Sequence, residues 1–209
     1  MRLWSYQHPS VVETLQRGER YVCRWEWVPG ERWQNAFRWM GEQMAQRDIH
    51  TGEYAPVWTW HSVRRIGGKP DLDCADALLF GYQLAQGIDV LELAVPDHLA
   101  LPSCYGAWNN VLDSFTMGYE TEVQDIADCF AVRLTPRRGR PPIRFPGIQA
   151  CLPYIEPAWL VSWEKLDIEL LYEQRRAAGE ASKAFFEQYE VVEWKFGAKG
   201  KLSVKITKK

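Results

Sequence analysis

The sequence contains three polar side chains whose neighbours suggest a catalytic or ligand-binding role: Glu92, Asp71 and Gln149. Glu92 interrupts the apolar run V-L-E-L-A-V, and a carboxylate buried in a strand must be paired or stay protonated. Asp71 follows two glycines and Pro70 in G-G-K-P-D-L-D, a loop that can approach a substrate closely. Gln149, in G-I-Q-A-C-L, offers an amide to a base edge or a ribose. The structural alternatives are an ion-paired acid, an Asx turn and an amide that satisfies a backbone group.

Eleven tryptophans in 209 residues are the second informative feature. Trp58 and Trp60 lie two residues apart in P-V-W-T-W, and Trp25 and Trp27 do so in R-W-E-W. Side chains two residues apart in a strand share one face, so each pair is expected to place two indoles side by side. Such a face is either a layer of the core or a platform for a flat ligand such as a nucleobase.

Several catalytic classes are disfavoured because their motifs are missing from the sequence. The four histidines have no metal-ligand spacing, and the five cysteines never form C-x-x-C. The sequence also contains no Gly-rich phosphate loop, nucleophile elbow or H-E-x-x-H motif. Phosphate-loop nucleotide hydrolysis and zinc hydrolysis are therefore not selected, and no metal or cofactor is expected.

The net charge of −2 gives the whole chain no attraction to nucleic acid, but the charges are unevenly distributed. Five arginines and no acid lie between residues 133 and 144, and six lysines and no acid lie between residues 195 and 209. Basic side chains beside an aromatic-rich body can hold phosphates while the rings stack on bases. Phosphate contacts are expected from Arg64, Arg137, Arg138 and Arg140.

The composition is that of an ordinary globular protein, with 46% hydrophobic and 25% charged residues. The chain has no apolar run long enough to span a membrane, and Met1-Arg-Leu-Trp lacks signal-peptide character. These features predict a cytoplasmic protein with reduced thiols. Neither a membrane nor an obligate protein partner is expected.

The spacing of apolar residues predicts an α+β fold, a single mixed α/β domain in which helices surround a central, strongly curved sheet. Strands are predicted over 2–6, 21–27, 54–63, 88–95 and 148–155, and helices over 10–18, 31–47, 105–115 and 169–189. Ser10 is the expected N-cap of the first helix, with Glu13 completing a capping box. Residues 1–168 are expected to hold the catalytic or binding site, and residues 169–209 to form a C-terminal helix and basic tail of the same domain.

An ordered series of short motifs resembles a bacterial family long described as a domain of unknown function. The motifs are L-W-S-Y-Q at 3–7, P-V-W-T-W at 56–60, K-P-D-L at 69–72, L-E-L-A-V-P at 91–96 and W-N-N-V-L at 108–112. The resemblance covers about residues 1–115, with Ile148-Gln149-Ala150 as a further match. The chain departs from the family at Asn109, where the family tends to have histidine, and at 102–105, where the family tends to have an acidic serine loop.

The order of elements also resembles the ADP-ribosyltransferase fold. In that order a first strand with a polar ligand residue leads to a helix and an aromatic strand, and a late strand carries Glu or Gln. The resemblance implies chemistry at an N-glycosidic bond, which breaks at the sugar C1′ through a positively charged, oxocarbenium-like state. A carboxylate at such a site stabilises the positive charge or activates water.

These observations lead to the hypothesis of a DNA glycosylase in phage defence, which flips a modified base, such as a bulky modified cytosine, out of DNA and leaves an abasic site. Glu92 or Asp71 is the expected catalytic acid. Lys69 is close enough to Asp71 in sequence that attack on C1′ by its amine is an alternative to attack by water. The expected substrate-binding residues are Trp4, Gln7, Trp58, Trp60, Trp108, Asn110 and Gln149.

Two other functions stay open. An NAD-dependent ADP-ribosyltransferase would hold nicotinamide and its ribose in the same pocket, although Gln7 stands where that fold places a histidine or arginine. A non-enzymatic reader of modified DNA would bind a base in an aromatic cage without forming a product.

Overall fold

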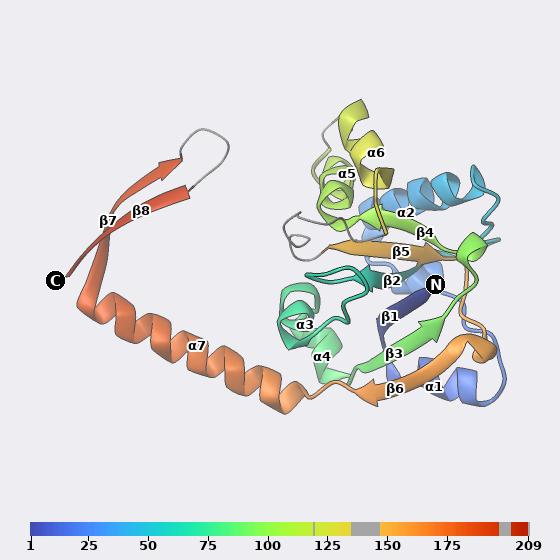
Figure 1. Ribbon diagram of the computed structural model, residues 1–209, viewed down its shortest axis with the longest axis horizontal. Coiled ribbons are helices and arrows are strands. Elements are labelled where there is room, and N and C mark those ends of the chain that lie inside the picture. The colour runs from blue at the N-terminus through green and yellow to red at the C-terminus, as the bar shows by residue number, and fades with distance from the viewer. Residues whose placement is uncertain (119, 135–146, 197–201, 209) are drawn as a thin grey trace. The chain divides into compact units, whose positions relative to one another are not determined.

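The computed structural model describes residues 1–118, 120–134, 147–196 and 202–208 (Figure 1). The chain divides into two compact units, Met1–Leu166 and Asp167–Lys209. The sequence analysis placed the start of the C-terminal part at residue 169, close to this boundary. The expected α+β fold class is confirmed, because the first unit combines helices with an antiparallel sheet that does not close on itself.

The strands of the first unit are β1 (Arg2–Gln7), β2 (Val57–Ser62), β3 (Asp89–Ala94), β4 (Leu101–Cys104), β5 (Ile148–Leu152) and β6 (Leu160–Lys165). Its helices are α1 (Pro9–Gln16), α2 (Gly30–Ala45), α3 (Leu72–Leu78), α4 (Gly81–Ala85), α5 (Tyr105–Met117) and α6 (Val123–Phe130). Pairs of these α-helices separate β1 from β2, β2 from β3 and β4 from β5. Short 3-10 helices occur at Trp25–Trp27, Asp97–Leu99 and Pro157–Trp159.

In the described part of the chain, six strands form one antiparallel sheet in the order β4-β5-β2-β1-β3-β6. β1 pairs with β3 along its whole length, from Arg2↔Ala94 to Gln7↔Asp89. Its register with β2, in contrast, is the single pair Trp4↔Trp60. Beyond this pair the Ser5 Oγ donates a hydrogen bond to the Trp58 carbonyl at 2.8 Å, a side-chain link at a place where a backbone ladder would otherwise continue. The sheet is therefore weakly joined between β1 and β2.

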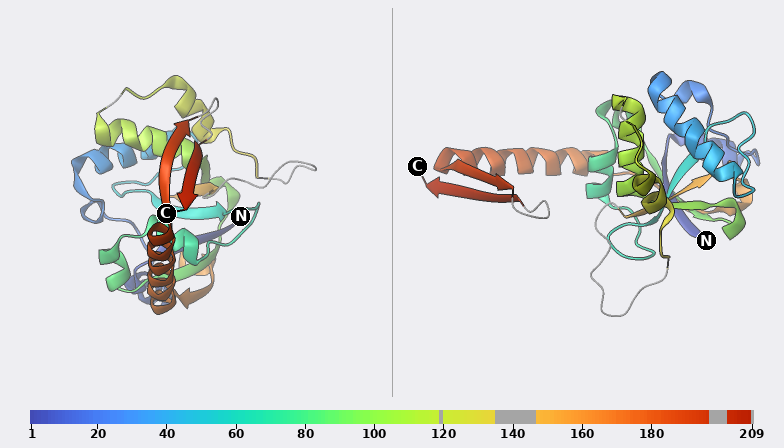
Figure 2. Two further views of the ribbon diagram at one scale, coloured as in Figure 1. Left: turned by 90° about the vertical axis from the view of Figure 1, so that its left-hand side faces the viewer. Right: turned by 90° about the horizontal axis from the view of Figure 1, so that it is seen from above.

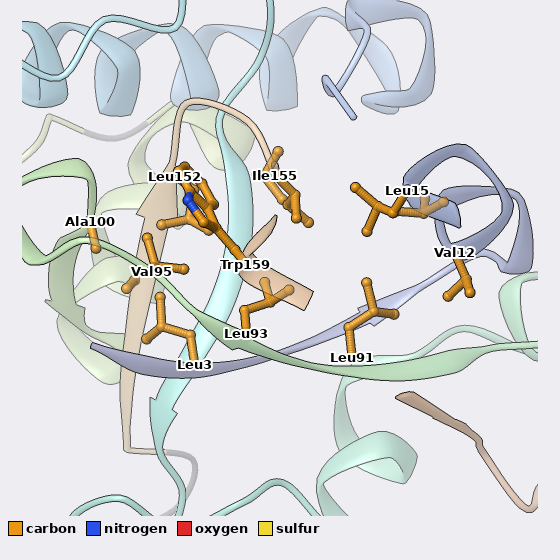
Figure 3. Packing of buried hydrophobic residues seen from close by; sticks show 13 residues of the cluster. Leu3, Val12, Leu15, Leu91, Leu93, Val95, Ala100, Leu152, Ile155 and Trp159 are labelled. Atoms are coloured by element: carbon orange, nitrogen blue, oxygen red, sulfur yellow. The ribbon is translucent and has the colours of Figure 1, made fainter. Parts of the chain in front are cut away.

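One face of the sheet carries the larger apolar core, which α1 covers (Figure 3). Alternation along the strands points Leu3, Leu91 and Leu93 to this face, and all three are fully buried. Val12 and Leu15 of α1 pack against them because helix residues three or four apart share one side. This core holds β1 and β3 together.

The opposite face is covered by α2 and α5, which lie next to each other (Figure 2). Met40 and Met44 of α2 and Val111 of α5 are fully buried, as the helical spacing of their apolar residues requires. These helices contact Leu101 and Cys151, which belong to β4 and β5. The helix expected over 31–47 is thereby confirmed.

Two local predictions are wrong. Residues 21–27 do not form a strand, since Tyr21 and Cys23 make isolated bridges to Ile155 and Ala55 and a 3-10 helix begins at Trp25. Trp25 and Trp27 therefore do not share a strand face. Ser10 is also not the N-cap of α1. His8 takes that position, and its Nδ1 accepts a hydrogen bond from the Ser10 backbone N–H at 3.2 Å. The helix starts two residues earlier than expected because Pro9 is favoured at the first helical position.

The second unit consists of α7 (Ile168–Gln188) and a hairpin of β7 (Tyr189–Phe196) and β8 (Leu202–Lys208). The helix agrees with the polar helix expected over 169–189. The basic C-terminal segment, expected as a strand or tail, forms a two-stranded antiparallel ladder from Tyr189↔Lys208 to Phe196↔Leu202.

Candidate functional site

A cavity of about 740 Å³ opens beside the weak junction of β1 and β2. Tyr6 and Gln7 line it from the end of β1, and Trp58 and Thr59 line it from β2. On this side of the Trp4↔Trp60 pair, no further residues of β1 and β2 are paired with each other. The remaining walls come from the start of α1, the segment around the first 3-10 helix, α2, the α3–α4 region, Ile88 before β3, α5 and β5.

One row of side chains runs across the sheet and brings several sequence-predicted residues together. Register places Glu92 opposite Trp4, Trp4 opposite Trp60, Trp60 opposite Gln149, and Gln149 opposite Ser103. Directly paired residues project to the same face of a sheet, so this row faces the helices α2 and α5 rather than the core under α1. Trp60 and Gln149 line the cavity, and the other members of the row flank them.

Gln149 is the most unusual polar residue of the cavity. It is 3% exposed, and its Nε2 has no hydrogen-bond partner among the described residues. A buried donor without an acceptor costs about 1–3 kcal/mol, so native proteins rarely leave one without a purpose. The Trp58 Nε1, also on the cavity wall, is likewise buried and unpartnered within the described chain. Two residues of the cavity lining thus carry a buried hydrogen-bond donor with no acceptor among the described residues.

Aromatic rings form the wall around these donors. Trp60 packs against Tyr105 with ring centroids 5.1 Å apart, and Trp58 packs against Trp108 at 4.7 Å. Phe37 closes the same group at 5.2 Å from Trp58. Flat apolar walls with a few polar atoms are typical of sites for planar ligands.

The first strand contributes polar groups to the opposite wall. Gln7 donates its Nε2 to the Ser5 Oγ at 2.7 Å, which fixes the amide beside the cavity. His8 lines the cavity with an exposed imidazole whose Nδ1 contacts the Ser10 Oγ at 2.8 Å. Burial raises the pKa of Tyr6, so its phenol stays protonated and donates to the Asp71 carbonyl at 2.9 Å.

Asp89 is a buried carboxylate next to this wall that the sequence analysis did not select. It is 3% exposed, lies opposite Gln7 in the β1–β3 ladder, and directly follows the cavity residue Ile88. Its Oδ1 has no hydrogen-bond partner in the described part of the chain. Burial raises the pKa of Asp89, while the charges of Lys165 and His8 act in the opposite direction.

Replacing Asp89 with asparagine is expected to raise the free energy of unfolding at pH 7. Because the pKa of Asp89 is higher in the folded than in the unfolded protein, the folded state binds the proton more tightly. Stability is then lost as pH rises from about 4 through the folded pKa. Urea titrations between pH 4 and 7 should show a flatter dependence for Asp89→Asn than for the wild type. Asp113→Asn, at an exposed site on α5, is the control, and a variant less stable than the wild type at pH 7 would contradict the expectation.

The two expected catalytic acids are held in ion pairs outside the cavity lining. The Glu92 Oε1 lies 2.6 Å from the Arg2 Nη2, and its Oε2 accepts a hydrogen bond from the Ser162 Oγ at 3.2 Å. The Asp71 Oδ1 caps α3 by accepting from the Cys74 backbone N–H at 3.0 Å, and its Oδ2 is 3.4 Å from the Arg64 Nε. Both acids match the structural alternatives that the sequence left open.

The other expected site residues divide into those that line the cavity and those that do not. Gln7, Trp58, Trp60, Trp108 and Gln149 line it. Trp4 is buried in the row beside it, and Asn110 donates to the Asp125 Oδ1 at 2.9 Å, whereas the preceding Asn109 lines the cavity.

Two basic residues of the region around 64–69 are ion-paired. The Arg64 Nη2 lies 2.6 Å from the Asp73 Oδ2, and the Lys69 Nζ lies 2.6 Å from the Glu164 Oε1. Arg137, Arg138 and Arg140 lie outside the described residues.

Several further residues line the cavity, and of these only Trp27 stood out in the sequence, as half of the Trp25 and Trp27 pair. Trp27, Phe80 and Tyr82 are exposed at the mouth of the cavity, and Tyr105 and His8 lie on its walls. Phe80 and Tyr82 come from the region of the short helices α3 and α4, for which the sequence predicted no helix. The acidic N-cap Asp71 before L-D-C-A-D-A-L was the available signal for α3.

In the described ranges, no three His, Cys, Asp or Glu side chains gather as a metal site. All five cysteine thiols are free, and burial raises the pKa of Cys74 to about 12. None of the helices in the described part of the chain has the length and apolar character of a membrane span.

Comparison with known proteins adds one finding. Neither the curated proteins nor the solved structures contain a significant match to the chain. The family described as Domain of unknown function (DUF3841) matches residues 2–126, which run from β1 into α6 and include most of the cavity lining. Because this match spans more than half of the 209 residues, the chain belongs to the family Domain of unknown function (DUF3841).

Proposed function

We propose that the cavity binds a nucleobase turned out of DNA, and that the protein is a DNA glycosylase which removes a modified base. The observation that carries the proposal is that Gln149, a residue of the aromatic-walled cavity lining, has a buried Nε2 without a partner among the described residues. A base fits such a site in two ways. Its ring can stack on the aromatic walls, and its carbonyl oxygen or ring nitrogen can accept a hydrogen bond from the amide. A bulky modified cytosine of phage DNA is the first candidate, and action on DNA in antiviral defence implies a cytoplasmic protein.

The size of the cavity supports a substituted base. At about 740 Å³ it lies within the range of roughly 300–1,000 Å³ that is typical of small-molecule sites. Selectivity for a modified base also explains how a cell tolerates the enzyme, because the ordinary bases of its own DNA lack the substituent that fills the space.

The proposed reaction is hydrolysis at C1′ of the flipped nucleotide. Water attacks C1′, the C1′–N bond breaks, and its electron pair leaves with the base, which takes up a proton. The sugar keeps a hydroxyl at C1′ and becomes an abasic site. His8 lies on the cavity wall and its Nδ1 accepts a hydrogen bond from the Ser10 N–H, so its Nε2 carries the proton, and we assign to this N–H a hydrogen bond to the departing base. Glu92 and Asp71 do not line the cavity, so a role for either requires the substrate to reach beyond it.

The test is an incubation of the purified chain with two DNAs, one plain and one with hypermodified cytosine, each with and without NAD. Abasic sites are measured as alkali-labile strand breaks, and the released base is identified by mass spectrometry. Breaks confined to the modified DNA and independent of NAD are expected. Breaks in neither DNA would reject the glycosylase, and binding of modified DNA without product would establish a non-enzymatic reader.

A second candidate is an NAD-dependent ADP-ribosyltransferase, and the placement of Gln149 favours it. The polar end of β1 leads into α1, then to the aromatic β2, and the late strand β5 carries Gln149 into the cavity. This is the order that resembles the ADP-ribosyltransferase fold. Mass added to DNA or protein only in the presence of NAD would select this function.

A further inference from the structure

Aromatic side chains are exposed at the mouth of the cavity, which is unusual for rings of this size. Trp27, Phe80 and Tyr82 are 54%, 57% and 58% exposed, and all three line the cavity. They come from two segments far apart in sequence, the first 3-10 helix and the start of α4. Trp163 of β6 is 41% exposed but does not line the cavity, so it is a matched reference for these rings.

The exposed rings are arranged as two parallel stacks, which we call the mouth platforms. Trp27 stacks on Tyr21 with centroids 6.0 Å apart and an interplanar angle of 5°. Phe80 stacks on Tyr82 at 5.9 Å and 8°. Stacks this close to parallel present flat apolar faces rather than the tilted packing found between Trp58 and Trp108 in the cavity wall.

Local backbone contacts hold both platforms in place. The Trp27 N–H donates to the Arg24 carbonyl at 3.1 Å within the 3-10 helix. The Phe80 N–H donates to the Gln83 Oε1 at 2.9 Å at the start of α4. The rings are therefore preorganised, so little conformational entropy is lost when a flat ligand stacks on them.

We propose that the mouth platforms stack the nucleotides that flank the base in the cavity, and that the protein therefore takes single-stranded DNA. Stacking on aromatic rings is available to every base, but only where the base is not already stacked inside a duplex. The inference rests on the proposed function, since it assumes that the cavity holds a base.

The charges near the mouth agree with this partner. The Arg24 guanidinium lies over the Trp27 ring, 5.6 Å from its centroid, so it is within reach of the phosphates of a nucleotide bound at this ring. Its ion pair with Glu26 is exposed and long, at 3.5 Å, so a phosphate can replace the carboxylate at little cost. With a net charge of −2, the chain gains little from general electrostatic attraction, which makes stacking the main source of affinity.

The test compares binding of a labelled single-stranded oligonucleotide and the same sequence as a duplex, measured by fluorescence anisotropy. Trp27→Ala and the double variant Phe80→Ala/Tyr82→Ala are each expected to weaken single-strand binding about ten-fold or more. Trp163→Ala should leave it unchanged. Phe80→Leu/Tyr82→Leu keeps apolar surface but removes the flat rings, so it should bind as weakly as the alanine variant.

Melting temperatures exclude unfolding as the cause of any loss, and the exposed positions are expected to tolerate substitution. Tighter binding of duplex than of single strand, or equal single-strand affinity in the platform variants and Trp163→Ala, would overturn the proposal. Self-association that the platform variants abolish, without DNA binding, would assign the rings to a protein contact and overturn it as well.

The two proposals fail in different ways. If the cavity holds no base, single-strand binding still depends on the platforms but no base is released. If the platforms are not used, Gln149→Met loses base release while the platform variants retain both binding and release.

Discussion

Gln149→Met is expected to abolish most of the base release while leaving the protein as stable as the wild type or more stable. Methionine keeps the length and volume of the side chain but removes the buried Nε2, which has no partner among the described residues. Loss of an unsatisfied donor should add about 1 kcal/mol or more to the free energy of unfolding. Loss of the hydrogen bond to the substrate should lower kcat/KM about ten-fold or more, measured as abasic sites formed on modified DNA.

The matched control is Gln46→Met, at the exposed C-terminal end of α2, which should change neither quantity. A stabilised variant with lost activity is the signature of a residue kept for binding rather than for folding. Unchanged base release in Gln149→Met would remove the observation on which the proposed function rests. A variant that is destabilised instead would show that the amide satisfies a group in the fold.

Leu93→Ala should produce the largest loss of stability in the first unit. Leu93 on β3 is fully buried in the core cluster that also contains Trp159, and it lies opposite Leu3 in the ladder (Figure 3). Truncation of a leucine in such a core costs about 2–5 kcal/mol, because the lost transfer energy adds to the cavity that remains. Urea denaturation followed by circular dichroism measures the change.

Val161→Ala is the control for this prediction because Val161 is exposed on β6, the neighbour of β3. A surface change of this kind should stay within about 0.5 kcal/mol of the wild type. A cost below about 1 kcal/mol for Leu93→Ala would mean that the sheet and α1 collapse around the missing side chain.

The local part of the fold was predictable from the sequence because its signals are local. Met40 and Met44 lie at helical spacing, so α2 was identified from periodicity alone. Val57–Ser62 alternates and became β2 as expected. Tyr21–Trp27 has the same alternation, but it pairs with other segments only through isolated bridges at Tyr21 and Cys23. Its last three residues form a 3-10 helix instead of a strand.

The candidate site was predictable only in its residue types. Gln149 was predicted because it is a lone amide in an apolar segment, and Trp60 because it is one of a pair of indoles. The structure pairs the two residues across β2 and β5, and both line the cavity. Their alignment with Trp4 and Glu92 depends on strand register between distant segments, which no local pattern contains. Asp89 was not predicted as a site residue. Its position next to Gln7 follows from the β1–β3 ladder and not from its own neighbours in sequence.

The position of β5 between β4 and β2 also has a consequence for synthesis of the chain. Thr59 and Ala150, which are joined by a buried hydrogen bond, lie 91 residues apart. At about 5–20 residues per second, a ribosome needs roughly 5–18 s to make β5 after β2. During that interval Trp58 and Trp60 stand on a strand without its later neighbour. We therefore expect nascent chains of this protein to be most prone to aggregation before β5 has been made. Late pairing of β5 with β2 and β4 is expected to limit the rate of folding.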